Sequence, residues 1–292
     1  MPVPTSGEIG LIGVGLLGSA IAQRLINAGY SLVGFDLNPD RAAWLSQQGG
    51  SSAAKASEIF ARCNQIILSL PTSRHVAELI DSLEIPPRNG TLLIDTTTGS
   101  PDEALDMGER LAASNVDYLD ATILGSSHDL TIGQAILMAG GKDKAFARAL
   151  PIVEHLIKKS FHVGSWGAGS KMKLVVNLVL GLNRAVLAEG LSFAAQLGFE
   201  PQTTLDILSS GVAYSSVMET KGPRMLAGEF TPQARLKQHH KDVRLILEQA
   251  AARELPLPLS ELHERLLSDC IEAGWGDLDN SAIIKLWEQN RN

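Results

Sequence analysis

Short apolar runs alternate with amphipathic stretches over the first 163 residues of the chain. A short apolar run between turn residues is typical of a buried strand, whereas apolar residues at a three-to-four-residue spacing indicate a helix. The predicted strands cover 8–13, 31–35, 65–69, 91–95, 117–121 and 135–139, with 159–162 as a further candidate. The predicted helices between them cover 19–28, 41–48, 57–61, 74–82 and 101–114. This alternation is typical of a doubly wound, mostly parallel sheet with helices on both faces, so we expect an α/β Rossmann domain over residues 1–163.

The pattern changes at about Gly164, after which helical spacing dominates and no strand is predicted. The predicted helices cover 174–197, 203–211, 237–253, 258–273 and 281–289. The segment 164–170 is rich in small residues, which is typical of a hinge. We therefore expect an all-helical domain over residues 164–292 for substrate binding and dimerisation. A ligand cleft is expected between the two domains, beside the carboxyl ends of the strands.

A G-x-G-x-x-G motif, formed by Gly13, Gly15 and Gly18, joins the first predicted strand to the first predicted helix. In a dinucleotide-binding turn the first glycine permits the tight turn, the second lets the backbone approach the pyrophosphate, and the third lets the helix pack close to the strand. The N–H groups at the start of the helix then point at the phosphates. An ordinary strand–turn–helix connection is the alternative. The residues predicted to contact the dinucleotide here are Gly13, Val14, Gly15, Leu16, Leu17 and Gly18.

Asp36 ends the second predicted strand. An acid about twenty residues beyond the glycines is placed to accept hydrogen bonds from the adenosine ribose hydroxyls. Its carboxylate repels a 2′-phosphate, so NAD is the expected cofactor, and Arg41 keeps NADP open as the alternative.

Composition narrows the classes of function. The formal net charge of −7 comes without a basic stripe, which argues against a nucleic-acid partner. No run of about 18 consecutive apolar residues is present, so no membrane span is expected. Cys63 and Cys270 lie far apart and have no metal-ligand spacing, which fits a reducing cytoplasm, and we assign no metal.

Lys173 and Asn177 lie four residues apart at the start of the longest predicted helix, so they share one helix face. A lysine desolvated at a domain hinge has a lowered pKa, which suits a general acid or base. From these residues alone, a lysine that extends to solvent is the simpler interpretation. The loop after Asp120 is also open to two interpretations, as a carboxylate-binding loop or as a plain connection. The helix over 236–245 shows only a charged face.

Together these segments resemble the β-hydroxyacid dehydrogenase family, which includes 3-hydroxyisobutyrate dehydrogenase and tartronate semialdehyde reductase. The resemblance covers nearly the whole chain. It is carried by the opening glycine-rich signature, by the segments 70–72 and 95–101, by the sequence Lys-Leu-Val-Val-Asn at 173–177, and by Lys241-Asp242.

The resemblance implies a Rossmann domain followed by a helical domain in a homodimer or homotetramer. It also implies hydride transfer between a nicotinamide cofactor and a small 3-hydroxy acid or the corresponding semialdehyde. Lys173 falls on the catalytic lysine of the family, and Asn177 is expected to orient the substrate. Leu70, Pro71 and Thr98 are expected to flank the nicotinamide half of the cofactor. Lys241 is also expected to contact the cofactor. Gly125 and Ser126 are expected to bind the substrate carboxylate through backbone groups.

The chain departs from the family in the substrate loop. The usual pattern is D-x-P-V-S-G-G-x-x-G-A, whereas this chain has Leu124 at the serine, Ser126 at the second glycine and Asp129 at the third. This change leaves two further functions to weigh, an imine or other carbonyl reductase of the same fold and a non-catalytic dinucleotide sensor. The family lysine at position 173 argues against both.

Overall fold

The computed structural model describes residues 7–289, which form two compact units divided between Lys173 and Leu174. The strands of the first unit are β1 (Ile9–Ile12), β2 (Leu32–Phe35), β3 (Ser51–Ser52), β4 (Gln65–Leu68), β5 (Leu92–Asp95), β6 (Asp117–Leu124), β7 (Ile136–Gly141) and β8 (Lys159–Gly164). Its helices are α1 (Leu16–Asn27), α2 (Pro39–Gln47), α3 (Ala56–Arg62), α4 (Ser73–Asp81), α5 (Pro101–Ala113), α6 (Ser127–Thr131) and α7 (Asp143–Val153).

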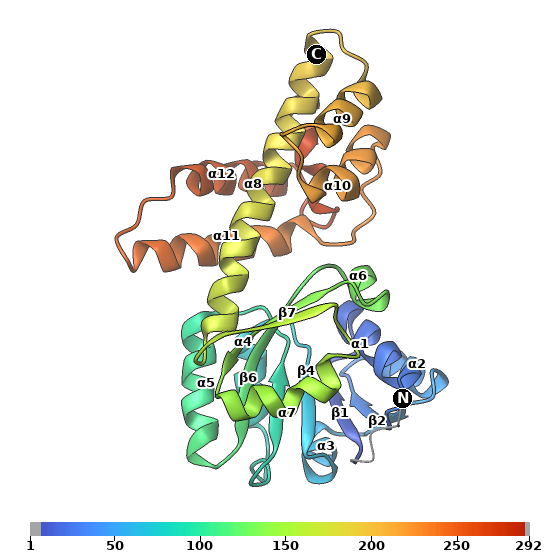
Figure 1. The fold of residues 1–292 in the computed structure, drawn as a ribbon, viewed down its shortest axis with the longest axis vertical. Helices are drawn as coiled ribbons and strands as arrows, with labels where there is room; N and C mark the ends of the chain where they lie inside the picture. The colour runs from blue at the N-terminus through green and yellow to red at the C-terminus, as the bar shows by residue number, and fades with distance from the viewer. Residues whose placement is uncertain (1–6, 290–292) are drawn as a thin grey trace. The chain divides into compact units, whose positions relative to one another are not determined.

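The strands form one sheet in the order β3-β2-β1-β4-β5-β6-β7-β8. All neighbours are parallel except β6 and β7, where Leu119 pairs with Gly141 in an antiparallel register. β1 lies between β2 and β4, so the chain leaves β1 toward one edge of the sheet and later returns to build the other (Figure 1). The loop after β1 therefore lies at the point where the strand order reverses, which is where open α/β sheets bind ligands.

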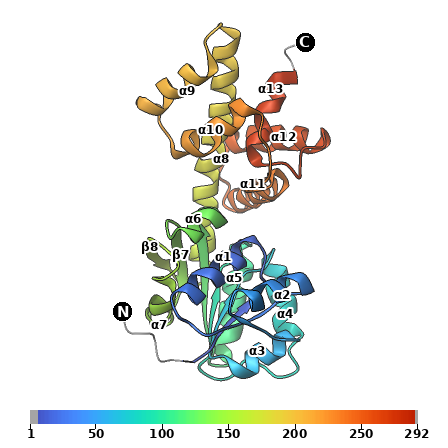
Figure 2. The same ribbon diagram turned by 90° about the vertical axis from the view of Figure 1, so that its right-hand side faces the viewer.

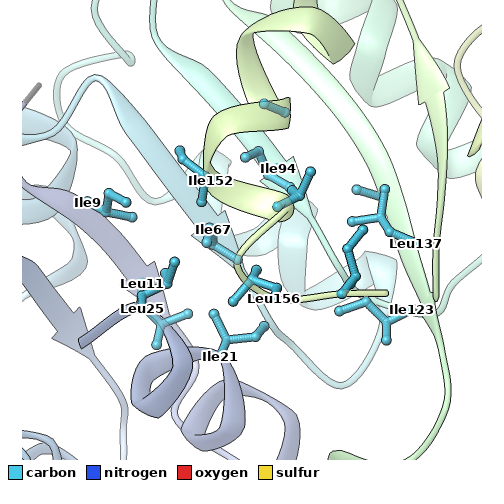
Figure 3. Packing of buried hydrophobic residues seen from close by; sticks show 14 of the residues in the cluster. Ile9, Leu11, Ile21, Leu25, Ile67, Ile94, Ile123, Leu137, Ile152 and Leu156 are labelled. Atoms are coloured by element: carbon cyan, nitrogen blue, oxygen red, sulfur yellow. The ribbon is translucent and has the colours of Figure 1, made fainter. Parts of the chain in front are cut away.

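Side chains that alternate along the strands build a hydrophobic core on each face of the sheet. Ile9 and Leu11 of β1 belong to a cluster with residues of α1, α2, α6 and α7 (Figure 3). Ile12 of β1 belongs to a second cluster, with residues of α3, α4 and α5. Both faces of the sheet are thus covered by helices, and the doubly wound α/β fold expected from the sequence is confirmed.

The helical unit begins within α8 (Ala168–Gln196), whose first turns belong to the first unit. Its other elements are α9 (Pro201–Ser210), α10 (Ser216–Ala227), α11 (Leu236–Ala251), α12 (Pro258–Glu272), the 3₁₀ helix η1 (Asn280–Ile284) and α13 (Lys285–Gln289), coloured from yellow to red in Figures 1 and 2. Leu187, Ala188, Val243, Leu267 and Ile283 are among the side chains of its core. This unit has no β-strand among its described residues, as the sequence predicts.

α8 is long and apolar enough to cross a membrane by length and composition alone, and 44% of its most apolar window is buried within the structure. This is weak evidence for a membrane span, because the core helix of a soluble protein meets the same criterion.

Two differences from the predicted elements have physical causes. The division between the units falls at 173/174, where the sequence pattern suggested 163/164, because the helix that starts at Ala168 packs its first turn on β6. α10 was not predicted, because Gly222 and Pro223 are helix breakers. In the fold, Val217 and Met225 of this helix are buried in the core, and their burial outweighs the low helix propensity.

Candidate functional site

The turn between β1 and α1 has the geometry that the glycine spacing predicts. Gly13 has φ +93°, and a Cβ there would lie 2.2 Å from the carbonyl oxygen of Ser69. A Cβ on Gly18 would lie 2.0 Å from the carbonyl oxygen of Gly13. Both positions therefore require glycine. A Cβ on Gly15 would meet no protein atom within 4 Å, so the backbone at the start of α1 faces open space. The N–H groups of this helix start are donors for a phosphate.

Asp36, at the end of β2, is bound to the same turn. Its Oδ2 accepts a hydrogen bond from the backbone N–H of Val14 at 2.6 Å, and its Oδ1 accepts one from Asn38 at 2.8 Å. A carboxylate offers about four lone-pair sites, so Asp36 can still accept from two ribose hydroxyls. The two backbone bonds fix the carboxylate beside the glycine-rich turn.

A cavity of about 650 Å³ lies at the carboxyl ends of β1, β2 and β4. Its walls combine apolar side chains, which suit an adenine ring, with charged side chains such as Asp36, which suits a ribose. The lining residues include Gly13, Gly15, Asp36, Leu37, Leu70, Pro71, His75, Leu79 and Leu83. Among the predicted cofactor residues, Leu70 is held by Thr97, whose hydroxyl accepts from the Leu70 N–H at 3.2 Å. Thr98 follows in the loop after β5 and is not part of this lining.

Lys173 lies near the start of α8 and is half-buried. Its ammonium Nζ donates to the backbone carbonyl of Ile123, near the end of β6, at 2.6 Å. The amine is therefore held at the sheet edge where the strands of the first unit end.

The first turn of α8 is fixed to β6 by side chains of that strand. The Asp120 carboxylate accepts from the N–H of Gly167 at 3.1 Å and from the N–H of Ser170 at 2.8 Å. The hydroxyl of Thr122 donates to the carbonyl of Gly169 at 3.1 Å. Burial raises the pKa of Asp120 to about 6, although the two N–H donors favour its charged form. These contacts set the position of Lys173 on the next turn of the helix.

Ser126, in the loop after β6, is bonded to Asp129. Its backbone N–H and its hydroxyl both donate to Oδ2 of Asp129, each at 2.7 Å, and its Oγ accepts from the Asp129 N–H at 3.1 Å. This reciprocal pair caps α6. In this structure the N–H and the hydroxyl of Ser126 are thus bound to a carboxylate of the protein, and the substrate-binding role of Gly125 and Ser126 stays a prediction. Gly125, next to them, is exposed and has φ +128°.

Asn177 and Lys241 lie in the helical unit. The Asn177 side-chain amide donates to Oδ2 of Asp242 at 3.0 Å, and both residues are buried. A carboxylate only accepts, so this bond directs the amide nitrogen toward Asp242 and leaves the carbonyl oxygen of Asn177 to face elsewhere. The Lys241 ammonium lies 3.7 Å from Oδ1 of Asp242. Asp242 therefore organises both sequence-predicted residues of this unit.

No group of three or more metal-ligating side chains occurs in the part of the chain that the structure describes. The histidines make local contacts. Nδ1 of His75, in the cavity lining, is 2.6 Å from the Thr72 hydroxyl, and His240 lies 2.8 Å from Glu264. His239 and His263 are buried side by side, with ring centroids 5.2 Å apart.

Two family models match consecutive parts of the chain. The model of the NAD binding domain of 6-phosphogluconate dehydrogenase matches residues 8–164. The model described as NAD-binding of NADP-dependent 3-hydroxyisobutyrate dehydrogenase matches residues 167–287. The chain belongs to the β-hydroxyacid dehydrogenase family. Members of this family are oxidoreductases that use NAD(P), and the resemblance seen in the sequence is confirmed.

Curated relatives within this family match almost end to end. The 2-(hydroxymethyl)glutarate dehydrogenase of Eubacterium barkeri is 30% identical over 286 residues, which cover 97% of this chain and 95% of that protein. The L-threonate dehydrogenase of Cupriavidus necator is 29% identical over 287 residues, which cover 97% of this chain and 96% of that protein. The family thus contains relatives of similar identity that carry different substrate names.

A solved structure of the family has the same fold. The 3-hydroxyisobutyrate dehydrogenase of Mycobacterium tuberculosis, determined with L-serine, superimposes with a TM-score of 0.89 at 26% identity. The match covers 99% of this chain and all of the other.

Three acids that bond to the predicted site residues, or to the segments that carry them, were not identified as such from the sequence. They are Asp120, which holds the start of α8; Asp129, which caps α6; and Asp242, which binds Asn177. For Asp129 the sequence contained a signal, because it stands where the family pattern has glycine. For Asp242 the signal was the Lys-Asp pair itself, of which only the lysine was assigned a role.

Proposed function

We propose that this chain transfers hydride between NAD and a small 3-hydroxy acid or the corresponding semialdehyde, with Lys173 as the general acid and base. Bound NAD(P) supplies the hydride acceptor or donor. The observation that carries the proposal is the placement of the Lys173 amine, 2.6 Å from the Ile123 carbonyl at the end of β6. Its helix is fixed there by Asp120.

In the oxidative direction, neutral Lys173 accepts the proton of the substrate hydroxyl as the hydride leaves the same carbon. In the reductive direction, its ammonium returns that proton to the carbonyl oxygen. General acid–base assistance of this kind contributes typically about a hundred- to ten-thousandfold in rate. The Ile123 carbonyl oxygen accepts a hydrogen bond from the Lys173 amine and so orients it. The carbonyl is a weak base, so it does not take the transferred proton from the amine.

Asn177, one helical turn after Lys173, is the second residue of the proposed catalytic pair. Because Asp242 takes its amide N–H, the oxygen of Asn177 is the atom available to accept from the substrate hydroxyl or from Lys173. Asp242 is thus a positioning residue in this scheme. Lys241 is proposed to contact the cofactor, as the family motif implies.

The cofactor contacts proposed for the first unit are the residues of the glycine-rich turn, Asp36, Leu70, Pro71 and Thr98. The Asp36 carboxylate, fixed by the N–H groups of Val14 and Asn38, favours ribose hydroxyls over a 2′-phosphate. NAD is therefore the proposed physiological cofactor, with NADP as the weaker one. We place the enzyme in the cytoplasm, which agrees with two buried cysteines that form no disulfide.

We also propose that the enzyme is a homo-oligomer, a dimer or a tetramer. Val179, Val186 and Phe193 of α8 follow one another at seven-residue spacing and are more than half exposed. A stripe at that spacing stays on one side of a helix and is typical of a helix–helix contact. Sedimentation analysis of the wild type and of a Val186→Glu variant tests this assembly, which the variant should weaken.

Reduction of small semialdehydes is the experiment that tests the activity. Oxidation of NADH and NADPH would be followed with glyoxylate, succinic semialdehyde and a cyclic imine as separate substrates. The proposal predicts turnover of at least one aldehyde, with a higher kcat/KM for NADH than for NADPH. Turnover of the imine alone would contradict it and support an imine reductase. Tight NADH binding without turnover of any compound would support a sensor.

A further inference from the structure

The loop that follows β6 begins two residues after Ile123, whose carbonyl holds the Lys173 amine. The Lys173 amine is bonded to the carbonyl of Ile123, and Ser126 is three residues further along the chain. Three residues span at most about 10 Å. A substrate of three or four carbons with its hydroxyl on the amine can therefore lie beside this loop, whose groups would then meet substituents next to the reacting carbon.

The loop presents a carboxylate where free donors would be needed to bind an acid. Both hydrogens that Ser126 can offer, on its backbone nitrogen and on its hydroxyl, are taken by Oδ2 of Asp129. The arrangement is anchored, because the next residue, Leu130, is fully buried in the core and Gly125 holds a left-handed backbone. Leu124 adds an apolar side chain and no donor. An incoming carboxylate would have to displace Asp129 from these bonds.

The charge of Asp129, like its hydrogen bonds with Ser126, disfavours a substrate carboxylate in this loop. Asp129 is half-buried, so its charge is incompletely screened by solvent. A second carboxylate on the same donors would meet a like charge. A substrate hydroxyl would instead donate to Asp129, because only two of the carboxylate's lone-pair sites are used by Ser126.

We propose that Asp129 is a specificity-determining residue that excludes a carboxylate from the loop side of the reacting carbon and selects a hydroxyl-bearing group there. The substrate class is a hydroxymethyl- or polyhydroxy-substituted carbonyl compound and its alcohol. Where the substrate is also an acid, its carboxylate lies on the side of the reacting carbon away from Gly125 and Ser126. The inference rests on the proposed hydride transfer at Lys173, and it is an alternative to the expectation that Gly125 and Ser126 bind the carboxylate.

Glyoxylate and glycolaldehyde form a matched pair of probes, because they differ only in a carboxylate or a hydroxymethyl group beside the aldehyde. We would measure kcat/KM for both with NADH in wild type and in Asp129→Asn, whose amide keeps the shape of the cap without its charge. Wild type should prefer glycolaldehyde. Asp129→Asn should shift the ratio of the two kcat/KM values toward glyoxylate by at least about tenfold, the factor that corresponds to about 1.4 kcal/mol. An unchanged ratio overturns the proposal.

Three variants separate the charge of Asp129 from other effects. Ser126→Ala removes the two hydrogen bonds of the Ser126 hydroxyl and keeps the Asp129 carboxylate with its bond to the Ser126 N–H, so it should leave the preference for glycolaldehyde in place. Asp143→Asn removes one negative charge from a side chain that is 97% exposed, so it should leave the ratio unchanged. Asp129→Gly restores the family residue and should favour glyoxylate at least as strongly as Asp129→Asn. A change of ratio in Asp143→Asn equal to that in Asp129→Asn overturns the local explanation.

A binding measurement distinguishes failure of this inference from failure of the proposed reaction. Oxalate, a carboxylate that cannot be reduced by hydride here, would be titrated calorimetrically into each protein with NADH present. Oxalate should bind Asp129→Asn at least about tenfold more tightly than wild type, whether or not either protein turns over an aldehyde. Equal affinities contradict the role of Asp129, and absence of turnover with unequal affinities contradicts only the proposed reaction.

Discussion

The two units of this enzyme bury charge in different ways. In the sheet unit the buried charged groups are acids, and Asp120 and Asp95 are satisfied mainly by backbone N–H groups and hydroxyls at the ends of the strands. In the helical unit the buried acids Asp242 and Asp279 are accompanied by the buried basic side chains Arg184 and Lys221, and Lys221 pairs with Asp279 at 2.9 Å.

The difference follows from what each architecture leaves unpaired. Loops at the carboxyl ends of strands and the first turns of helices expose N–H groups that have no partner in the ladder or helix, and a buried acid can satisfy them. Helices satisfy most of their own backbone groups, so a buried acid among them finds fewer backbone donors and also pairs with a basic side chain, as Asp279 does with Lys221 beside the N–H groups of Gln233, Ala234 and Ser281. The sheet unit therefore uses its acids to fix backbone segments at the strand ends, and the helical unit uses an ion pair between helices as well.

The largest expected effect is on the cluster in the helical unit. Asp279 is fully buried and accepts from Lys221 at 2.9 Å and 3.0 Å, which keeps its pKa low, at about 2. Asp279→Asn leaves the cations of Lys221 and Arg184 without a counter-charge, and it should lower the free energy of unfolding by about 3–5 kcal/mol. Urea denaturation measures this. Asp277→Asn, which breaks the exposed pair with Lys237, is the matched control and should change little. Similar losses in the two variants would show that the burial of Asp279 and its pair with Lys221 do not set its contribution to stability.

A loss of stability of comparable size is expected at the matching acid of the sheet unit. Asp120→Ala leaves the N–H groups of Gly167 and Ser170 without their acceptor, at a cost of about 1–3 kcal/mol for each buried group. The same change releases the turn that precedes Lys173, so kcat should fall more than KM rises. Steady-state kinetics beside urea denaturation checks both effects. A variant that is destabilised but keeps its kcat would show that Asp120 supports the fold and not the amine.

The two units should respond to pH in opposite directions. Burial, with the charge of Arg184, lowers the pKa of His263 from 6.5 to about 4, so the neutral form is favoured in the fold. Its contribution of about 3 kcal/mol is complete above pH 6.5 and is lost as pH falls toward 4. Burial raises the pKa of Asp120 from 3.8 to about 6, so its contribution, also about 3 kcal/mol, is complete below pH 3.8 and is lost as pH rises through 6.

Hydrogen exchange at several pH values, corrected for the intrinsic exchange rate, resolves the two units. Protection of α12 should decrease from pH 6.5 to 4, while protection of the first turn of α8 should increase. His263→Gln and Asp120→Asn should each flatten the response of their own unit only. Parallel changes in both units would show that these two groups do not control them.

The smallest effect is expected at Arg184. Burial lowers the pKa of this arginine to about 10, and its Nε and Nη1 are buried without a hydrogen-bond partner. The charge of Arg184 is poorly compensated, and Arg184→Met puts an apolar side chain of similar length in its place. Stability should therefore stay equal or rise by about 1–3 kcal/mol. Thermal unfolding measures the change. A clear loss of stability would show that Arg184 is a required member of the cluster.

The sequence predicted residues whose partners are close along the chain, but not residues whose partners are distant. Gly13, Gly18 and Asp36 were predictable because dinucleotide binding imposes fixed spacings on a single strand–turn–helix segment. The role of Asp120 was not predictable, because the N–H groups that it binds, those of Gly167 and Ser170, lie 47 and 50 residues away in the sequence. A lone acid in a sequence resembles a surface residue. The bond between Asn177 and Asp242 joins residues 65 apart and was invisible for the same reason.

The boundaries of the elements show a related limit. β3 has only two residues, Ser51 and Ser52, so no apolar pattern marks it, and it is recognisable only through its pairing with β2. The burial of Arg184, His263 and Lys221 depends on how helices α8, α10 and α12 pack. Residue spacing predicts that such helices exist, but packing decides which of their polar residues lie inside.

The most direct test of the account is single-turnover hydride transfer in Lys173→Ala. NADH and a saturating aldehyde would be mixed rapidly with wild type and variant, and the affinity for NADH would be measured separately by fluorescence. The account predicts unchanged NADH affinity and hydride transfer slowed by about a hundred- to ten-thousandfold, because only the proton donor is lost. Hydride transfer at a near-normal rate in Lys173→Ala would contradict it.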